Sequence, residues 1–241
     1  METFALRKLL VQMSGAPGSG KTTTANLLAK AIDAFIVDHD VLKTFFLDIE
    51  TPFGQAGKNA YRLQSMLTEE LLKQGKNVIV DSTVNYQNTL DIGLVLAQRY
   101  GYTYKYVECR VSVEDIELLD ERLRRRTPIR SQRTGIGRPP PDADTVGHDT
   151  DYHALFKKWI ERPCRPADEN SVITVYSSIS TPESCLAQIL ERILPSGEAQ
   201  ISNGILSDHH IMSLMLIEAL MFSCSPQRLR RFSPWSKWRR P

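Results

Sequence analysis

The sequence predicts an α/β protein built on a mainly parallel five-stranded sheet. Short apolar runs alternate along the chain with longer segments whose apolar residues recur at helical spacing, the pattern of strands joined by crossover helices. The length of 241 residues, 41% of them hydrophobic, suffices for one such domain and an appendage. The five expected strands are residues 9–13, 34–37, 77–83, 102–109 and 172–176.

The expected helices lie between these runs. Gly75 and Gly101 follow two of them at the position that favours a left-handed residue, and Thr181 is placed to cap the last. Residues 47–57 contain one proline and two glycines and show no helical or strand periodicity of apolar residues. They are expected to form a mobile loop, the usual place for a segment that binds a substrate. The expected helices are residues 23–30, a segment starting at 41, and residues 58–74, 87–100, 114–126, 149–161 and 182–194.

One stretch carries a specific binding motif. Residues 15–22 fit the phosphate-loop pattern G-x-x-x-x-G-K-[ST] at every fixed position, between an expected strand and an expected helix. Its glycines let the backbone turn so that N–H groups point inward, towards phosphate oxygens. A glycine-rich turn without a ligand is the less favoured alternative, because the complete strand–turn–helix frame is present. The expected nucleotide-binding residues are Gly15, Ala16, Pro17, Gly18, Ser19, Gly20, Lys21, Thr22 and Thr23.

The side chains of this motif predict phosphate and metal chemistry. Lys21 can reach the β- and γ-phosphates and is a candidate catalytic residue, and Thr22 can offer its hydroxyl to Mg²⁺. Asp81 closes the third apolar run, where a carboxylate usually holds a metal-bound water. We therefore expect Thr22 and, through water, Asp81 to form the metal site; a turn-capping role is the alternative for Asp81.

Two further acids follow the second apolar run. Because parallel strands present their carboxyl ends to the ligand crevice, Asp40 is the first candidate for a general base and Asp38 the second. Either could instead cap the helix that follows. His39, between them, is expected to point the other way. Ser82, Thr83 and Asn85, after the third run, are further candidates for contacting the acceptor.

Arginines dominate the segment after the fourth expected strand. Arg122 and Arg126 are four residues apart and share a helix face, so one or both can clamp the transferring phosphate or stack on adenine. A solvated charged face is the alternative. Residues 127–147 are rich in proline, glycine and arginine and nearly lack apolar side chains, which favours a lid over a disordered loop.

Composition limits the other function classes. Residues 1–195 carry 24 Lys and Arg against 25 Asp and Glu, so this part is almost neutral and predicts no nucleic-acid groove. The four cysteines are widely spaced and indicate neither a disulfide framework nor a zinc site. No secretory signal and no apolar run of roughly 18–20 residues is present, which predicts a cytoplasmic protein without a transmembrane segment. The sequence predicts no oligomeric state.

The last 46 residues differ from the rest. Residues 211–222 are almost entirely apolar, and arginines, a lysine and two tryptophans follow them. We expect residues 1–195 to form the catalytic domain and residues 196–241 an irregular, partly disordered appendage without a role. A helix packed on the core, or a basic surface anchor, is the alternative.

Together these features resemble the phosphate-loop kinases of the adenylate-kinase-like group. The similarity rests on the phosphate loop, the acid after the second strand, Asp81-Ser82-Thr83 after the third, and the arginine-rich helix before the lid. Within the group, the chain is most similar to the kinase domain of polynucleotide 5′-kinases and related predicted AAA-domain kinases. Their acid is followed three residues later by arginine; here Lys43 follows Asp40.

This resemblance implies a three-layer phosphate-loop NTPase fold and an ATP-dependent kinase that requires Mg²⁺. The implied catalytic residues are Lys21, Asp40, Arg122 and Arg126, and the favoured acceptor is a hydroxyl group of a small molecule. A polynucleotide 5′-hydroxyl acceptor is less favoured, because the main body is not basic. An ATP hydrolase and a non-catalytic nucleotide-binding protein remain as alternatives, although the sequence contains neither Asn-Lys-x-Asp nor Leu-Ser-Gly-Gly-Gln.

Overall fold

The structure is a computed structural model that describes residues 8–83, 85–143 and 151–193. These residues belong to one compact unit, Met1–Pro195. The expected appendage, residues 196–241, and the end of the expected lid, residues 144–147, lie outside the described residues. No helix in the described ranges is long and apolar enough to span a membrane.

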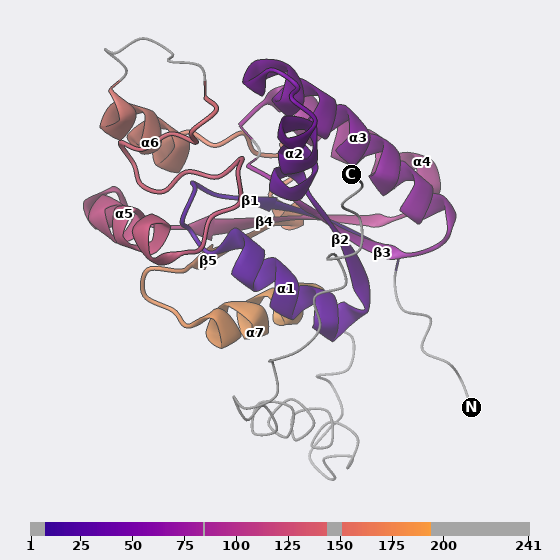
Figure 1. Ribbon diagram of the computed structural model, residues 1–241. Helices are drawn as coiled ribbons and strands as arrows, with labels where there is room; N and C mark the ends of the chain where they lie inside the picture. The colour runs from indigo at the N-terminus through magenta and orange to yellow at the C-terminus, as the bar shows by residue number, and fades with distance from the viewer. Residues whose placement is uncertain (1–7, 84, 144–150, 194–241) are drawn as a thin grey trace, which may run out of the picture. The chain divides into compact units, whose positions relative to one another are not determined.

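A five-stranded, fully parallel sheet forms the centre of the unit, in the order β2-β3-β1-β4-β5 (Figure 1). The strand that precedes the phosphate-loop motif is central, so the loop emerges at the middle of the carboxyl edge. The strands are β1 (Leu9–Ser14), β2 (Ala34–Asp38), β3 (Asn77–Asp81), β4 (Thr103–Arg110) and β5 (Val172–Tyr176). The expected parallel five-stranded sheet is therefore confirmed.

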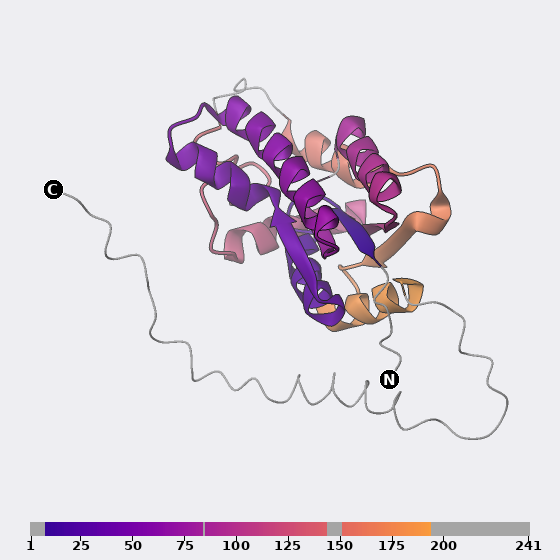
Figure 2. The same cartoon turned by 90° about the vertical axis from the view of Figure 1, so that its right-hand side faces the viewer.

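Helices cover both faces of the sheet (Figures 1 and 2). They are α1 (Lys21–Ile32), α2 (His39–Asp48), α3 (Phe53–Lys73), α4 (Gln87–Tyr100), α5 (Ile116–Arg125), α6 (Tyr152–Glu161) and α7 (Pro182–Ile193). Helices α1 and α7 pack on one face and α3 and α4 on the other, which gives three layers. The described part of the chain thus has the predicted α/β architecture.

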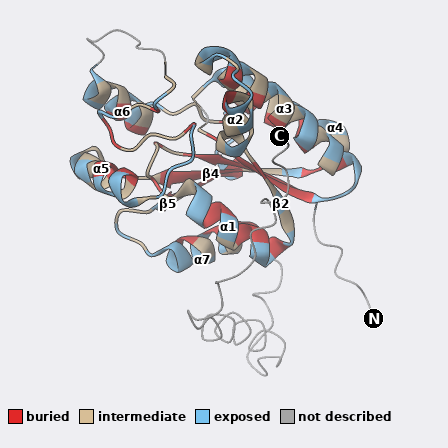
Figure 3. Cartoon of the chain, viewed as in Figure 1, coloured by how far each residue is buried: buried red, intermediate tan, exposed pale blue. Residues whose placement is uncertain are grey.

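The core follows the two-sided burial of a parallel sheet. Along β1, Val11 and Met13 pack with α1 and α7, whereas Leu10 packs with α3 and α4. Because successive strand residues face opposite sides, a strand buried on both faces must be apolar almost throughout. Figure 3 shows the buried residues concentrated along the strands and on the inner sides of the helices. A separate cluster, around Leu119, Leu123 and Phe156, joins α5 to α6 beside the phosphate loop.

The expected loop over residues 47–57 was wrong in extent. Helix α2 continues to Asp48, and α3 begins at Phe53 directly after Pro52. Gly54 and Gly57 lie inside the helix, where each glycine costs about 1 kcal/mol relative to alanine. Helix formation there also buries Ala56 completely and packs α3 against α2. Tertiary burial has overridden local propensity.

Candidate active site

The phosphate-loop motif adopts a conformation that requires glycine. Residues 15–20 connect β1 to α1, and Gly15, Gly18 and Gly20 have φ angles of 137°, 86° and 84°. A Cβ atom on Gly15 would lie 2.3 Å from the carbonyl oxygen of Cys109 on β4. The loop therefore needs glycine at this position for conformation and for space.

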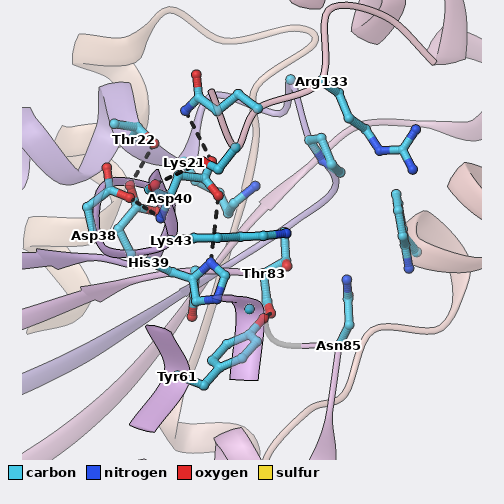
Figure 4. A pocket seen from close by; sticks show the side chains of 18 of the residues that line it. Lys21, Thr22, Asp38, His39, Asp40, Lys43, Tyr61, Thr83, Asn85 and Arg133 are labelled. Atoms are coloured by element: carbon cyan, nitrogen blue, oxygen red, sulfur yellow. Dashed lines mark hydrogen bonds and ion pairs between the residues drawn. The ribbon is translucent and has the colours of Figure 1, made fainter. Parts of the chain in front are cut away.

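Lys21 lies in the first turn of α1 and folds back over the loop. Its Nζ donates hydrogen bonds to the carbonyl oxygens of Gly15 and Ala16, at 2.9 and 3.0 Å. Burial lowers the pKa of Lys21, and the carboxylates of Asp81 and Asp40 oppose that shift. The ammonium group is thus held where the loop and the acids of the neighbouring strands meet (Figure 4).

Thr22, the residue after Lys21, connects α1 to β3 through a side-chain hydrogen bond. The Thr22 hydroxyl donates a 2.6 Å hydrogen bond to Oδ2 of Asp81. Burial raises the pKa of Asp81 to about 6, although the charge of Lys21 and the bond from Thr22 act in the opposite direction. A hydroxyl and a carboxylate oxygen are the donors that Mg²⁺ takes from proteins when substrate phosphates complete its coordination. The two side chains predicted to serve Mg²⁺ are therefore adjacent and chemically suited to it.

The two acids after β2 have different roles. Asp38 caps α2, because its Oδ1 accepts hydrogen bonds from the backbone N–H groups of Asp40 and Val41 at 2.7 and 3.3 Å. Asp40 does not cap the helix, and its Oδ2 accepts a 3.1 Å hydrogen bond from Nε2 of Gln132. Burial opposes ionisation of Asp40, but contacts with His39 and Gln132 and the charge of Lys21 lower its pKa. Asp40 is consequently a carboxylate at neutral pH.

The expectation that His39 points away from Asp40 was wrong. Its Nδ1 lies 3.7 Å from Oδ1 of Asp40, and its ring stacks on that of Tyr61 with centroids 4.0 Å apart (Figure 4). The expectation assumed strand geometry, in which successive side chains point to opposite faces. In the structure α2 already begins at His39, so the two side chains are separated by about 100° of helix rotation.

The two arginines predicted for catalysis both reach this region. Arg122 donates to the carbonyl oxygens of Ser177, at 2.7 Å, and of Gly18, at 3.5 Å, so it joins the phosphate loop to the segment after β5. Arg126 donates through Nε to the carbonyl of Arg133 at 3.2 Å. Burial lowers the pKa of Arg126, and the charge of Asp40 opposes this shift. Neither arginine forms an ion pair with a carboxylate of the described residues.

The described part of the expected lid, residues 127–143, is bound to α2. Ser131 donates to the carbonyl oxygen of Asp40 at 2.8 Å and accepts from the Thr44 hydroxyl at 3.0 Å. Arg130 forms two hydrogen bonds to Asp142, at 2.7 and 2.9 Å, and a longer one to Asp48.

Sequence reasoning missed Thr44, Ser131 and Gln132. One signal was available: Asp40, Thr44 and Asp48 recur every four residues and therefore share one face of α2.

Lys21, Asp40 and Asp81 line one cavity of about 1670 Å³, together with Thr22, the two arginines, Ser131 and Gln132. One end is formed by the phosphate loop, α1, the two arginines and the segment after β5. The other end is formed by α2, α3, the residues after β3 and helix α6, and includes Lys43, Tyr61, Thr83 and Asn85. Ser82, the remaining acceptor candidate, also lines the cavity. The structure thus brings every predicted catalytic and metal residue to the same cavity.

Comparisons with known proteins agree with this architecture. No curated protein matches the chain. Among solved structures, a candidate kinase from Chloroflexus aurantiacus is 17% identical, with 76% of this chain and 97% of that chain covered and a TM-score of 0.57. A sugar kinase from Janibacter sp. HTCC2649 is 16% identical, with 78% and 94% covered and a TM-score of 0.51. At these identities the two structures establish a shared fold only.

A family model described as an AAA domain matches residues 10–136, more than half of the chain. The match begins in β1, includes the phosphate loop and Asp81, and ends in the lid segment. It agrees with the resemblance to phosphate-loop kinases inferred from the motifs. The chain therefore belongs to the AAA domain family and has an α/β phosphate-loop NTPase fold.

Proposed function

We propose that the protein is an ATP-dependent phosphotransferase that moves the γ-phosphate of ATP to a hydroxyl group of a small molecule. The observation that carries this proposal is the placement of Lys21, the Thr22–Asp81 pair and the Asp40 carboxylate in one cavity. A nucleotide-binding switch needs no carboxylate placed to orient an attacking nucleophile. Here Asp40 lines the same cavity as Lys43 and Tyr61, which lie outside the phosphate loop.

Each side chain has a role that follows from its surroundings. Phosphoryl transfer depends mainly on positioning and on neutralising the charge of the equatorial oxygens. Lys21 lies against the loop and brings its charge to the β- and γ-phosphates, while Arg122 on α5 and Arg126 at its C-cap cover the same end. Mg²⁺ held by Thr22 and, through water, by Asp81 would neutralise further phosphate charge.

The proposed role of Asp40 is to orient the acceptor hydroxyl group and to take its proton. Since its pKa is lowered, it is ionised and accepts a hydrogen bond from the attacking hydroxyl group. It is a weak base before the reaction, and it takes the proton as the new oxygen–phosphorus bond forms and the hydroxyl becomes acidic. Its first contribution is therefore to orient the nucleophile.

The acceptor end of the cavity favours a substrate with an anionic group. Lys43 lies with Nζ 3.4 Å from the centre of the Phe53 ring, and the Arg133 guanidinium lies 4.9 Å from the centre of the Tyr152 ring. Neither cation forms an ion pair with a carboxylate of the described residues. Burial lowers the pKa of Lys43 to about 8; Asp40 opposes this shift and the charge of Arg133 adds to it. A phosphate, sulfate or carboxylate on the acceptor would relieve the repulsion between the charges of Lys43 and Arg133.

The proposal can be tested with γ-labelled ATP, Mg²⁺ and matched acceptors. Suitable pairs, differing in one anionic group, are glycerate and glycerol, gluconate and glucose, and adenosine 3′-monophosphate and adenosine. We expect label on the anionic member of one pair, and loss of transfer with retained ATP binding in Asp40→Ala. Transfer only to 5′-hydroxyl oligonucleotides would favour the polynucleotide alternative. Acceptor-independent phosphate release would favour a hydrolase, and binding without turnover a non-catalytic module.

A further inference from the structure

His39 is a partly buried imidazole between the candidate base and an aromatic ring. Its side chain is only 12% exposed, its Nδ1 faces Oδ1 of Asp40 at 3.7 Å, and its ring lies on Tyr61 at an interplanar angle of 36°. Figure 4 shows the imidazole directed at the carboxylate. The side chain is therefore held close to the acid that handles the acceptor, and none of the roles assigned so far uses it.

The two ring nitrogens of His39 have different surroundings. Nε2 is buried and has no hydrogen-bond partner among the described residues, whichever nitrogen carries the proton. A neutral imidazole has one donor and one acceptor nitrogen, so the surroundings of Nδ1 decide between the two tautomers. A proton on Nδ1 points at the Asp40 carboxylate, whereas a lone pair on Nδ1 would face its negative charge. Geometry therefore assigns the Nδ1–H tautomer.

Helix α3 supplies the aromatic ring on which the His39 imidazole stacks. Tyr61 donates to the carbonyl oxygen of Thr83 at 3.4 Å. One turn further along, the buried Gln64 donates to the carbonyl oxygens of Val37 and Asp81, at 2.8 and 3.3 Å, and so ties α3 to the ends of β2 and β3. The stacking surface for the imidazole is thereby attached to the two strands that carry the acids.

The opposite side of the carboxylate is held by the lid. Gln132 donates to Oδ2 of Asp40, and Ser131 donates to its backbone carbonyl. The charged groups that act on Asp40 are Lys21 from α1, Lys43 within α2, Asp38 at the N-cap of α2, Asp81 from β3 and Arg126 at the C-cap of α5. Among the described residues, His39 contacts Oδ1 and Gln132 contacts Oδ2, so these two contacts together set the rotation of the carboxylate about its last bond.

We propose that His39 is a positioning residue, whose Nδ1–H group orients the carboxylate of Asp40 towards the acceptor hydroxyl; this inference rests on the phosphotransferase function proposed above. The contact of 3.7 Å is longer than a hydrogen bond, and such contacts tighten when substrates bind. With Nδ1 directed at the carboxylate and Nε2 buried, His39 acts through Asp40.

Steady-state kinetics of the full chain with ATP, Mg²⁺ and the best acceptor of the panel test the proposal. His39→Ala should lower kcat about tenfold and leave the KM for ATP unchanged, since misplacing a reacting group costs rate rather than nucleotide affinity. His39→Asn keeps an N–H donor close to the position of Nδ1 and should recover most of kcat. His153→Ala, which removes an exposed histidine of α6, is the matched control and should match the native protein.

The proposal is overturned if His39→Ala keeps kcat within twofold of the native protein, or if His39→Asn is as slow as His39→Ala. A second measurement does not depend on turnover. In ¹⁵N-labelled protein, His39 should show the Nδ1–H tautomer, and Asp40→Ala should abolish this preference. An Nε2–H tautomer in the native protein contradicts the assignment. If no acceptor is phosphorylated while the tautomer depends on Asp40, the phosphotransferase function fails and the His39–Asp40 pair stands.

Discussion

Gly93, inside α4, is a residue where local propensity and tertiary packing predict opposite effects of one substitution. Helix propensity alone predicts that Gly93→Ala stabilises the protein by about 1 kcal/mol. In the structure, a Cβ atom at this position would lie 2.4 Å from both Cδ and Oε1 of Gln12. Gln12 comes from β1 and is 2% exposed, so its amide cannot move into solvent.

The size of the effect follows from the partners of that amide. Its Nε2 donates to the carbonyl oxygen of Thr89 at 3.0 Å, and its Oε1 accepts from the hydroxyl of Tyr104. Displacing the amide leaves two buried groups unpaired, at about 1–3 kcal/mol each. Once the gain of about 1 kcal/mol in helix propensity is subtracted, we expect Gly93→Ala to lower the free energy of unfolding by about 1–5 kcal/mol. For a chain of this size each kcal/mol shifts Tm by about 2–4 °C.

Urea unfolding, followed by far-ultraviolet circular dichroism, measures this difference, and the m value should stay constant. Gly54→Ala is the matched control, because nothing lies within 4 Å of a Cβ atom at this helical glycine. It should raise the free energy of unfolding by up to about 1 kcal/mol. In a Gln12→Ala background the obstructing amide is gone, so Gly93→Ala should be neutral or stabilising. A higher Tm for Gly93→Ala in the native background would refute the packing argument.

Other predictions concern the cavity and the end of the chain. Lys21→Ala should reduce transfer more than about 100-fold and weaken ATP binding, because the proposed role of the ammonium is to neutralise the β- and γ-phosphates. Unchanged turnover and affinity would remove the basis of the proposed site. Asp81→Asn should raise the Mg²⁺ concentration needed for half-maximal activity, measured by metal titration, and an unchanged requirement would exclude Asp81 from the metal site. Lys43 carries its positive charge below its pKa of about 8 and loses it as the pH rises through that value. The KM of an anionic acceptor should therefore rise above pH 8, and Lys43→Gln should abolish this pH dependence. If the KM of the variant still rises above pH 8, another group is responsible. Truncation after Pro195 should leave transfer and solubility unchanged, and loss of either would give the last 46 residues a role.

Much of the fold was predictable from local pattern. The alternation of apolar runs with helical periods predicted five parallel strands and the helices between them, and the phosphate-loop motif predicted the turn between β1 and α1. Both signals are local, because backbone conformation at a glycine or a buried strand depends on residues close in sequence. The same local reasoning failed for residues 47–57, where burial of Ala56 against neighbouring helices outweighs two glycines.

The site was predictable as a set of residue types, and less so as a geometry. Asp38 and Asp40 look equivalent in the sequence, since both follow an apolar run. The start of α2 at His39 separates them, because it makes Asp38 the cap and turns His39 towards Asp40. A difference of two residues in where a helix begins thus changes which acid caps the helix and which histidine contact the other acid makes.

The chain alone therefore determined the fold class, the phosphate loop and the residue types of the site, since each is encoded by residues within a few positions of one another. Tertiary structure decided the strand order, the contact between Gln132 and Asp40 across 92 residues, and the seat of His39 on Tyr61. Such contacts depend on how distant elements pack, and no local period or motif records that packing.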